Sequence, residues 1–371
     1  HEEEERRMIL SWLSPLSYEA RQQQLLDRHQ AGTGSWLLEH EKFQRWRTTK
    51  GSVLWCSGIP GAGKTFMACV VINALREPDN SLSTQPVAFI YADHKERLQQ
   101  GLTNLLSSII RQLAWQNAAI LDVIVPKYRE HTSPASPASP SPLTLAEYRE
   151  ILQDIPKCAN RVFIVIDALD EIPDAEEEGI DCRFELLDTL AQLDCASLFC
   201  TSRPHINGSL YFTSFSEVVI EATDADLRAF LEAKLNRSRR LSGFLSKDKP
   251  LGDEIVQTIT RKASGMFLLA RLQIEQIMTA LSIRQVRSIL DKLSSRLSDM
   301  YEMTIERIQS QSDVEAALGM RAVSWVASIK RPLSVSEFIH AMSVEENDRS
   351  LPDSSLMDIH AILGASGGLL Q

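Results

Sequence analysis

The sequence is organised around one stretch, Gly58-Ile59-Pro60-Gly61-Ala62-Gly63-Lys64-Thr65, which is a complete G-x-x-x-x-G-K-[ST] pattern. An apolar run over 53–56 precedes it and predicts a strand, and a second apolar run over 66–75 follows it and predicts a helix. Strand, glycine-rich loop and helix in this order form a phosphate loop. The glycines let backbone N–H groups turn toward one anion, and the helix N-terminus adds partial positive charge. We therefore predict that residues 58–65 and the adjoining Phe66 bind the phosphates of a nucleotide.

Two side chains of this loop have expected roles of their own. Lys64 is placed to reach the β- and γ-phosphates, and the Thr65 hydroxyl is placed to ligate Mg²⁺. The alternative interpretation is a glycine-rich turn with an exposed lysine. It is the weaker one, because a second motif further along the chain fits the same site.

The second motif ends an apolar run with carboxylates. Residues 162–166 are all apolar and mostly β-branched, which predicts a strand buried on both faces, and Asp167-Ala168-Leu169-Asp170-Glu171 follow. The carboxyl end of a strand is where open α/β sheets bind ligands. We expect Asp167 to hold the Mg²⁺ and Asp170, or else Glu171, to orient or deprotonate an attacking water. A buried strand that ends in a solvated acidic loop is the alternative.

A third predicted strand, over 197–202, ends beside Arg203. If this strand lies between the two motif strands, Thr201 or Arg203 faces the γ-phosphate, and Arg203 senses it through a charge-assisted hydrogen bond. A surface arginine before a proline turn explains the segment equally well. On the N-terminal side of the phosphate loop, the segment that contains Gly34 and Trp36 is placed to wall the base, although Trp36 also fits the core of its own segment.

Composition and charge narrow the functional classes. The chain has 371 residues and a net charge of −10, so we expect no nucleic-acid partner. No apolar run reaches the ~18 residues of a membrane span, so we expect no membrane partner. The six cysteines form no C-x-x-C pair, and the first residues do not resemble a secretory signal, which favours a cytoplasmic protein with reduced thiols. Because the chain lacks an initiator Met, we expect a piece of a longer protein.

The predicted elements divide the chain into four regions. Residues 1–50 are a helical segment, strands and helices alternate over 51–222, and residues 223–310 are helical only. Residues 311–371 include a capping box, Ser334-Val335-Ser336-Glu337, at the start of a further helix. The stretch over 131–142 is rich in Pro and Ser and is typical of a linker or disordered loop. The fold class is therefore α/β, a parallel sheet flanked by helices, followed by an all-helical domain.

Together these residues resemble a NACHT domain, of the signal-transduction class of P-loop NTPases. That family's acidic signature has a small residue directly after the metal-binding Asp and two further acids, as Asp167 to Glu171 do. The amino-acid sequences over 32–38 and 54–65 are very similar to those of fungal NOD-like receptors. This region is grouped with the nephrocystin-type N-terminal domain. Phe267 stands where related proteins carry the proline of a Gly-x-Pro segment, so packing of a proline against the base is not implied. The residues from Arg331 resemble the start of a winged-helix domain.

The resemblance implies both a fold and a role. The third motif's strand should lie between the other two, and residues 311–371 should form part of a winged helix. Such proteins are switches in which ADP holds a closed monomer and ATP favours an open form that oligomerises. Effector domains and ankyrin, WD or TPR repeats usually flank this core. A histidine of the winged helix contacts the nucleotide in relatives, but neither His340 nor His360 matches a motif, and neither is assigned that role.

Three functions follow from these observations. We favour a switch that binds ATP or ADP with Mg²⁺, hydrolyses NTP slowly, and controls self-association in innate-immunity-like or cell-death signalling. A rapid-turnover kinase or motor NTPase is one alternative, and a nucleotide-binding scaffold without hydrolysis is another. GTP stays open as the nucleotide, since no N-K-x-D base-reading motif is evident.

Overall fold

The computed structural model of the chain describes residues 2–77, 85–93, 96, 99–133, 140–172, 181–331, 333–344, 355–366 and 370. The chain divides into two compact units, residues 1–229 and 230–371. The finer boundaries predicted at 50, 222 and 310 stay predictions. In the described residues no helix is both long enough and apolar enough to cross a bilayer.

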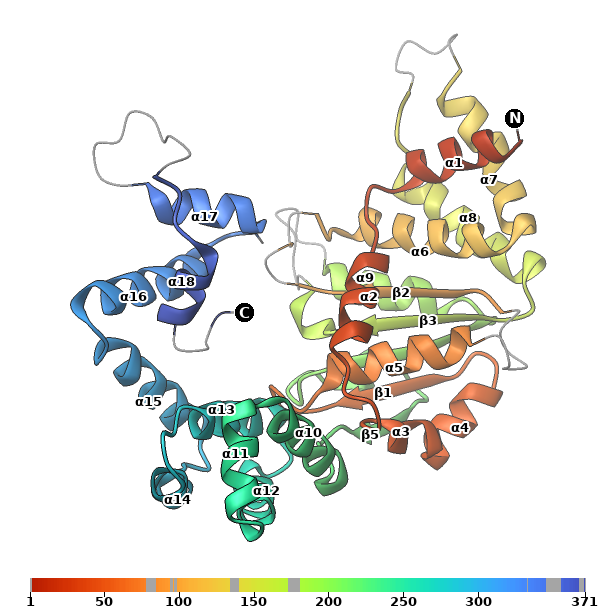
Figure 1. The fold of residues 1–371 in the computed structure, drawn as a ribbon. Helices are drawn as coiled ribbons and strands as arrows, with labels where there is room; N and C mark the ends of the chain where they lie inside the picture. Colours follow the sequence, from red (N-terminus) through yellow and green to blue (C-terminus); the bar gives the residue numbers. More distant parts are fainter. Residues whose placement is uncertain are drawn as a thin grey trace. The chain divides into compact units, whose positions relative to one another are not determined.

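The first unit is built on a parallel sheet of five strands (Figure 1). They are β1 (Val53–Ser57), β2 (Val87–Tyr91), β3 (Val162–Asp167), β4 (Ala196–Ser202) and β5 (Ser216–Val219), in the order β2-β3-β4-β1-β5. All four pairings are parallel. The strand of the third motif, β4, thus lies between β1 and β3, as predicted. The carboxyl ends of the three motif strands are therefore neighbours at one edge of the sheet.

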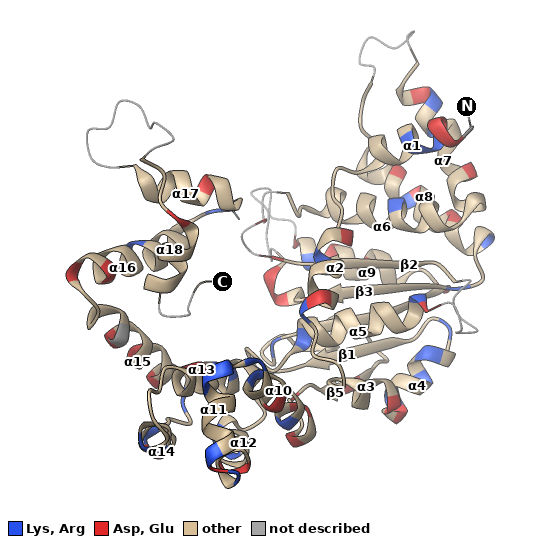
Figure 2. Ribbon diagram, in the orientation of Figure 1, with Lys and Arg blue, Asp and Glu red and all other residues tan. Residues whose placement is uncertain are grey.

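The strands β1 to β4 are buried along their whole length, the edge strand β2 included, which explains their largely apolar sequences. Figure 2 draws them almost wholly in the colour of uncharged residues. Asp167, at the carboxyl end of β3, is the one charged residue in β1 to β4. A lone carboxylate at the end of a buried strand indicates a site rather than a solvated loop.

Helices cover this sheet. They are α1 (Glu2–Leu13), α2 (Glu19–Arg28), α3 (Ser35–Glu39), α4 (Glu41–Thr48), α5 (Lys64–Arg76), α6 (Leu102–Gln116), α7 (Ala118–His131), α8 (Leu145–Cys158) and α9 (Cys182–Ala191). The phosphate-loop helix α5 packs against β2, β3 and β4, and α6 packs against β2. The sequence did not predict α7, which contains Pro126 and begins where the Asn117 side chain accepts two backbone N–H groups. Within the stretch predicted as a loop over 131–142, residues 134–139 lie outside the described residues.

Among its described residues, the regular elements of the second unit are all helices, whereas the prediction of helices alone covered only residues 223–310. Its helices are α10 (Asp224–Arg237, which begins in the first unit), α11 (Arg239–Lys247), α12 (Pro250–Ala263), α13 (Phe267–Met278), α14 (Ile283–Lys292), α15 (Leu297–Gln309), α16 (Asp313–Ser328), α17 (Val335–Ser343) and α18 (Ile359–Ala365). The capping box at Ser334 and Glu337 is present. Phe267, in the place of the family's proline, packs edge-on against the ring of Phe230. The winged-helix assignment of 311–371 stays a prediction.

A buried arginine, Arg161, connects the end of α4 to the amino end of β3, the end opposite to Asp167. Arg161, directly before β3, is only 6% exposed. Its guanidinium lies over the Phe163 ring and donates to three backbone carbonyl oxygens at the end of α4, those of Trp46, Arg47 and Thr49, at 2.7–2.8 Å. Burial lowers the pKa of Arg161 to about 10, so the side chain stays charged at neutral pH. It satisfies carbonyls that the helix leaves unpaired.

We expect Arg161→Met to lower the free energy of unfolding by about 3 kcal/mol, since it removes three charge-assisted hydrogen bonds. The carbonyl oxygens of Trp46 and Thr49 would keep only hydroxyl donors. Urea denaturation followed by circular dichroism measures the change. Arg45→Met is the matched control: Arg45 also lies on this segment, but it is exposed and pairs only with Glu41 of its own helix, so the expected change is within about 0.5 kcal/mol. Equal losses in the two variants would contradict a clamping role for Arg161.

Candidate nucleotide-binding site

The phosphate loop connects β1 to α5 and has a backbone that requires its glycines. Gly61 and Gly63 have φ values of +77° and +98°, in the left-handed region. Gly58 passes so close to the next segment that a Cβ there would lie 2.6 Å from the carbonyl oxygen of Ile220. Its N–H donates to the carbonyl oxygen of Ser202 at 3.1 Å, which ties the loop to the end of β4. The three glycines of the motif are thus each explained by the local backbone.

Lys64 lies across this loop and faces the acidic motif. Its Nζ donates to the carbonyl oxygens of Gly58 and Ile59 at 2.7 and 3.1 Å. Burial lowers the pKa of Lys64, and the nearby carboxylates of Asp170 and Asp167 oppose that shift. The two motifs, about a hundred residues apart in sequence, therefore come together as predicted.

Asp167 is the most buried carboxylate of the site, with 2% of its surface exposed. It accepts a hydrogen bond from Thr201 Oγ1 at 2.6 Å. Burial raises the pKa of Asp167, while the hydroxyls of Thr201 and Thr65 and the ammonium of Lys64 lower it. The predicted metal residues, Asp167 and Thr65, are therefore in contact.

These donors fit a magnesium ion better than a metal caged by the protein alone. Within the described ranges, no group of three His, Cys, Asp or Glu side chains is arranged to hold a metal. Mg²⁺ is commonly bound by one or two protein oxygens together with phosphates and waters. One carboxylate and one hydroxyl beside a phosphate loop match that donor set.

The acidic turn after β3 owes its shape to Ala168. This residue has φ +57°, a conformation that costs energy for any residue with a Cβ and that bulky or β-branched residues tolerate least. Its N–H donates to Thr201 Oγ1 at 2.9 Å, the same hydroxyl that binds Asp167. The positive φ explains why a small residue follows Asp167, and a short 3₁₀ helix, η2 (Leu169–Glu171), comes next.

Asp170, in this turn, forms an ion pair with Arg203, the residue after β4. Arg203 donates to Asp170 through its backbone N–H at 3.0 Å and through its Nε at 2.9 Å, one bond to each carboxylate oxygen. The Asp170 side chain is 5% exposed and that of Arg203 is 47% exposed. Arg203 therefore lies beside the acidic turn and is paired with Asp170, and its predicted contact with a γ-phosphate stays a prediction.

The segment before the phosphate loop contacts the first turns of α5. Gly34, with φ +79°, lies against Met67, and the His29 and Phe66 rings are 6.2 Å apart. Gly34 N–H donates to the buried carboxylate of Asp226 at 2.9 Å. The sequence did not predict Asp226 as a partner. Its only sign is that Asp224 and Asp226 stand at the start of the helical region predicted from residue 223.

Trp36 is half-buried beside the His40 ring, with its Nε1 buried and unpaired among the described residues. This placement agrees with the packing role that we kept as an alternative, and the base-walling role of Gly34 and Trp36 stays a prediction.

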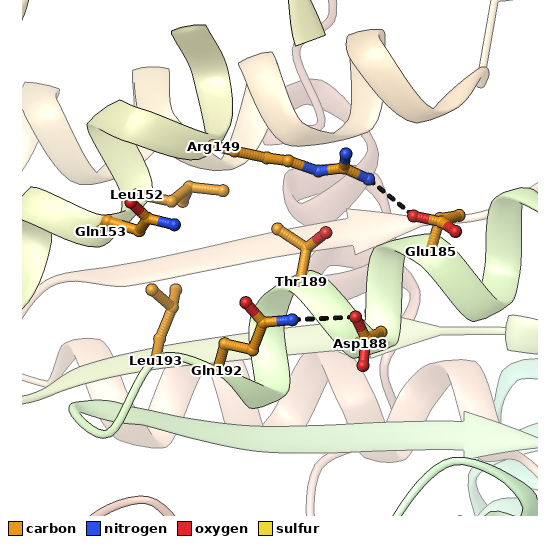
Figure 3. Close-up of a pocket in the computed structure, with 8 residues that line it drawn as sticks. All are labelled: Arg149, Leu152, Gln153, Glu185, Asp188, Thr189, Gln192 and Leu193. Carbon is orange, nitrogen blue, oxygen red and sulfur yellow. Dashed lines mark hydrogen bonds and ion pairs between the residues drawn. The ribbon is translucent and has the colours of Figure 1, made fainter. Parts of the chain in front are cut away.

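A cavity of about 220 Å³ between α8 and α9 lies apart from these residues (Figure 3). Its four charged or amide side chains that pair do so with each other, Arg149 with Glu185 at 2.6 Å and Gln192 with Asp188 at 2.9 Å. None of the predicted site residues lines it. The site is therefore defined by the phosphate loop and the acidic turn.

A comparison with known protein families matches the region that contains the phosphate loop and the acidic turn. Residues 32–203 match the family model described as nephrocystin 3, N-terminal. The chain is 26% identical over 340 residues to the vegetative incompatibility protein HET-E-1 of Podospora anserina. That match covers 86% of this chain and 23% of the fungal protein, so the chain spans about a quarter of its relative's length.

Two solved structures are similar at a greater distance. The Walker-type ATPase PABY2304 of Pyrococcus abyssi is 14% identical with a TM-score of 0.42, and the match covers 88% of this chain and 93% of that one. PCH-2 of C. elegans is 15% identical with a TM-score of 0.38, over 71% of this chain and 66% of that one. Scores this low carry no argument about function.

Proposed function

We propose that this chain, a NACHT-type chain of the fungal NOD-like receptor kind, is a nucleotide-dependent switch. It binds ATP or ADP, with GTP left open, hydrolyses NTP slowly in the cytoplasm, and controls self-association and signalling in innate-immunity-like or cell-death responses. Effector and repeat domains would lie elsewhere on the full-length protein. The observation that carries the proposal is the meeting of Lys64, Asp167, Asp170 and Arg203 at the carboxyl ends of three adjacent strands.

In this proposal each residue has a separate task. Residues 58–65 and Phe66 hold the phosphates, and Lys64 offsets their charge. Thr65 and Asp167 hold Mg²⁺, which when bound neutralises phosphate charge. Asp170, with Glu171 as the alternative, orients or deprotonates the attacking water. Gly34 and Trp36 are proposed to lie on the base side.

The Asp170–Arg203 pair supports a switch rather than a fixed site. A γ-phosphate near Lys64 offers Arg203 a second anionic partner that ADP lacks. Arg203 is half-exposed and long enough to change partners, whereas Asp170 is nearly buried. ATP would therefore compete with Asp170 for the guanidinium. A ligand shifts a conformational equilibrium only by such a difference in affinity between the two states.

We expect Arg203→Ala to lose discrimination between ATP and ADP while still binding ADP. One charge-assisted hydrogen bond is worth roughly 1.5–3 kcal/mol, or about a ten- to hundred-fold change in the ATP/ADP affinity ratio. Calorimetric titration of both nucleotides with Mg²⁺ measures it. Arg149→Ala is the control, since Arg149 forms a comparable half-exposed ion pair with Glu185 away from the site. An unchanged ratio in Arg203→Ala would mean that Arg203 is a surface arginine before a turn.

A turnover assay separates the switch from its two alternatives. Kinases typically reach about 1–100 s⁻¹, whereas a switch should release phosphate far more slowly and change its limited-proteolysis pattern between ADP and ATP. A rapid rate would favour the kinase or motor. Tight nucleotide binding without any phosphate release would favour the scaffold.

A further inference from the structure

A second buried arginine lies beside the acidic turn. Arg183 is the second residue of α9 and is only 5% exposed. Its Nε donates to the carbonyl oxygen of Leu169 at 2.7 Å, and its Nη2 donates to the carbonyl oxygen of Ile172 at 2.9 Å. The guanidinium thus bridges the two ends of a short segment whose interior is Asp170 and Glu171.

Local backbone preference alone would not keep this turn in shape. It begins at Ala168, whose positive φ is a costly conformation for a residue with a side chain. Thr201 holds the start of the turn through the Ala168 N–H, and Arg183 holds the rest through two carbonyls. A guanidinium is a planar fork whose donors have a fixed spacing, so it can set the distance between two acceptors.

The position of the turn matters because it carries both candidates for the water-orienting carboxylate. A displacement of about 1 Å in a reacting group can cost about a hundred-fold in rate. The phosphate loop and Asp167, by contrast, belong to β1, α5 and β3 and make none of the Arg183 contacts described above. A loosened turn should therefore slow hydrolysis without weakening nucleotide binding.

We propose that Arg183 is a positioning residue for hydrolysis, which holds the turn of Asp170 and Glu171 in register with the phosphate loop. The inference rests on the proposed function. It adds a residue with no predicted role, from a helix that follows the motif in sequence and that belongs to neither nucleotide motif.

Arg161 provides a matched control from the same sheet. It is equally buried and also donates to backbone carbonyls, but it lies at the opposite end of β3. Arg183→Met and Arg161→Met are compared, at a temperature below both unfolding transitions, for phosphate release under saturating ATP and for ADP affinity. We expect kcat to fall about ten- to a hundred-fold in Arg183→Met, with ADP affinity within about two-fold of wild type. In Arg161→Met both values should stay near wild type.

Equal kcat values in the two variants would overturn the proposal, and so would a parallel loss of ADP affinity in Arg183→Met. Arg183→Lys carries the test if the Met variant does not fold. It keeps the charge but cannot present two donors at a fixed spacing, so its kcat should stay below wild type, and full activity would also overturn the proposal. Wild-type phosphate release that Lys64→Ala leaves unchanged would instead contradict the proposed function itself.

Discussion

Lys64→Ala is expected to abolish binding of ADP and ATP while leaving the chain folded. Lys64 is the only basic residue among residues 58–65, and its ammonium lies across the loop, facing Asp167 and Asp170. A charge-assisted hydrogen bond contributes roughly 1.5–3 kcal/mol, and Lys64 is placed to reach two phosphates, so affinity should fall at least about a hundred-fold. Calorimetric titration with Mg²⁺ present measures the loss.

The fold should survive this change because the Lys64 ammonium bonds within its own loop, to Gly58 and Ile59. Lys42→Ala is the control. It removes another lysine of the first unit, whose Nζ bonds the carbonyl oxygen of Glu217 on β5, and it should bind nucleotide normally. Normal ADP and ATP affinity in a folded Lys64→Ala protein would refute the site assignment.

Asp170→Asn is expected to leave ADP affinity nearly intact and to slow hydrolysis. An asparagine keeps an oxygen for the backbone N–H of Arg203 but loses the charge that pairs with the guanidinium and acts on water. General base catalysis typically contributes about 10²- to 10⁴-fold, which bounds the expected loss in rate. Single-turnover phosphate release, measured beside ADP affinity, separates the two effects.

Glu171→Gln is the companion variant because Glu171 is the alternative for this role. Should Asp170→Asn hydrolyse at the native rate while Glu171→Gln does not, the two roles must be exchanged. In that case Asp170 would serve mainly to hold Arg203. Loss of ADP affinity in Asp170→Asn would contradict a role confined to hydrolysis.

The sheet could be predicted from the sequence because its signals are local. Each of the strands β1 to β4 is a short, mostly apolar run, and the two nucleotide motifs indicate which ends of the strands meet. The place of β4 between β1 and β3 came from the family resemblance, and the pairing confirms it. Helix α7 was missed because Pro126 lies in its interior, where a proline normally kinks or ends a helix. Helices α11, α14, α16 and α18 were not predicted individually, although residues 223–310 were expected to be helical.

The contacts that shape the site could not be predicted in the same way. Arg183 binds carbonyls 11 and 14 residues earlier, and Asp226 binds an N–H 192 residues away. Both contacts use backbone atoms, which every residue carries, so no residue pattern marks the partner. Arg203 was predicted to be at the site. Its pairing with Asp170 depends on how the segment after β4 and the turn after β3 are placed in the fold. The types of side chain in the motifs suggested nucleotide and metal binding. The hydrogen-bond and ion-pair partners of these side chains are given only by the fold.

The nucleotide that remains bound to the purified chain shows whether residues 58–65 form a nucleotide-binding site. Acid denaturation followed by anion-exchange chromatography identifies and counts what is released. We expect a bound nucleotide, chiefly ADP, in the wild-type protein and none in Lys64→Ala. A wild-type chain that releases no nucleotide, and that takes up neither ADP nor ATP when they are added with Mg²⁺, would contradict it.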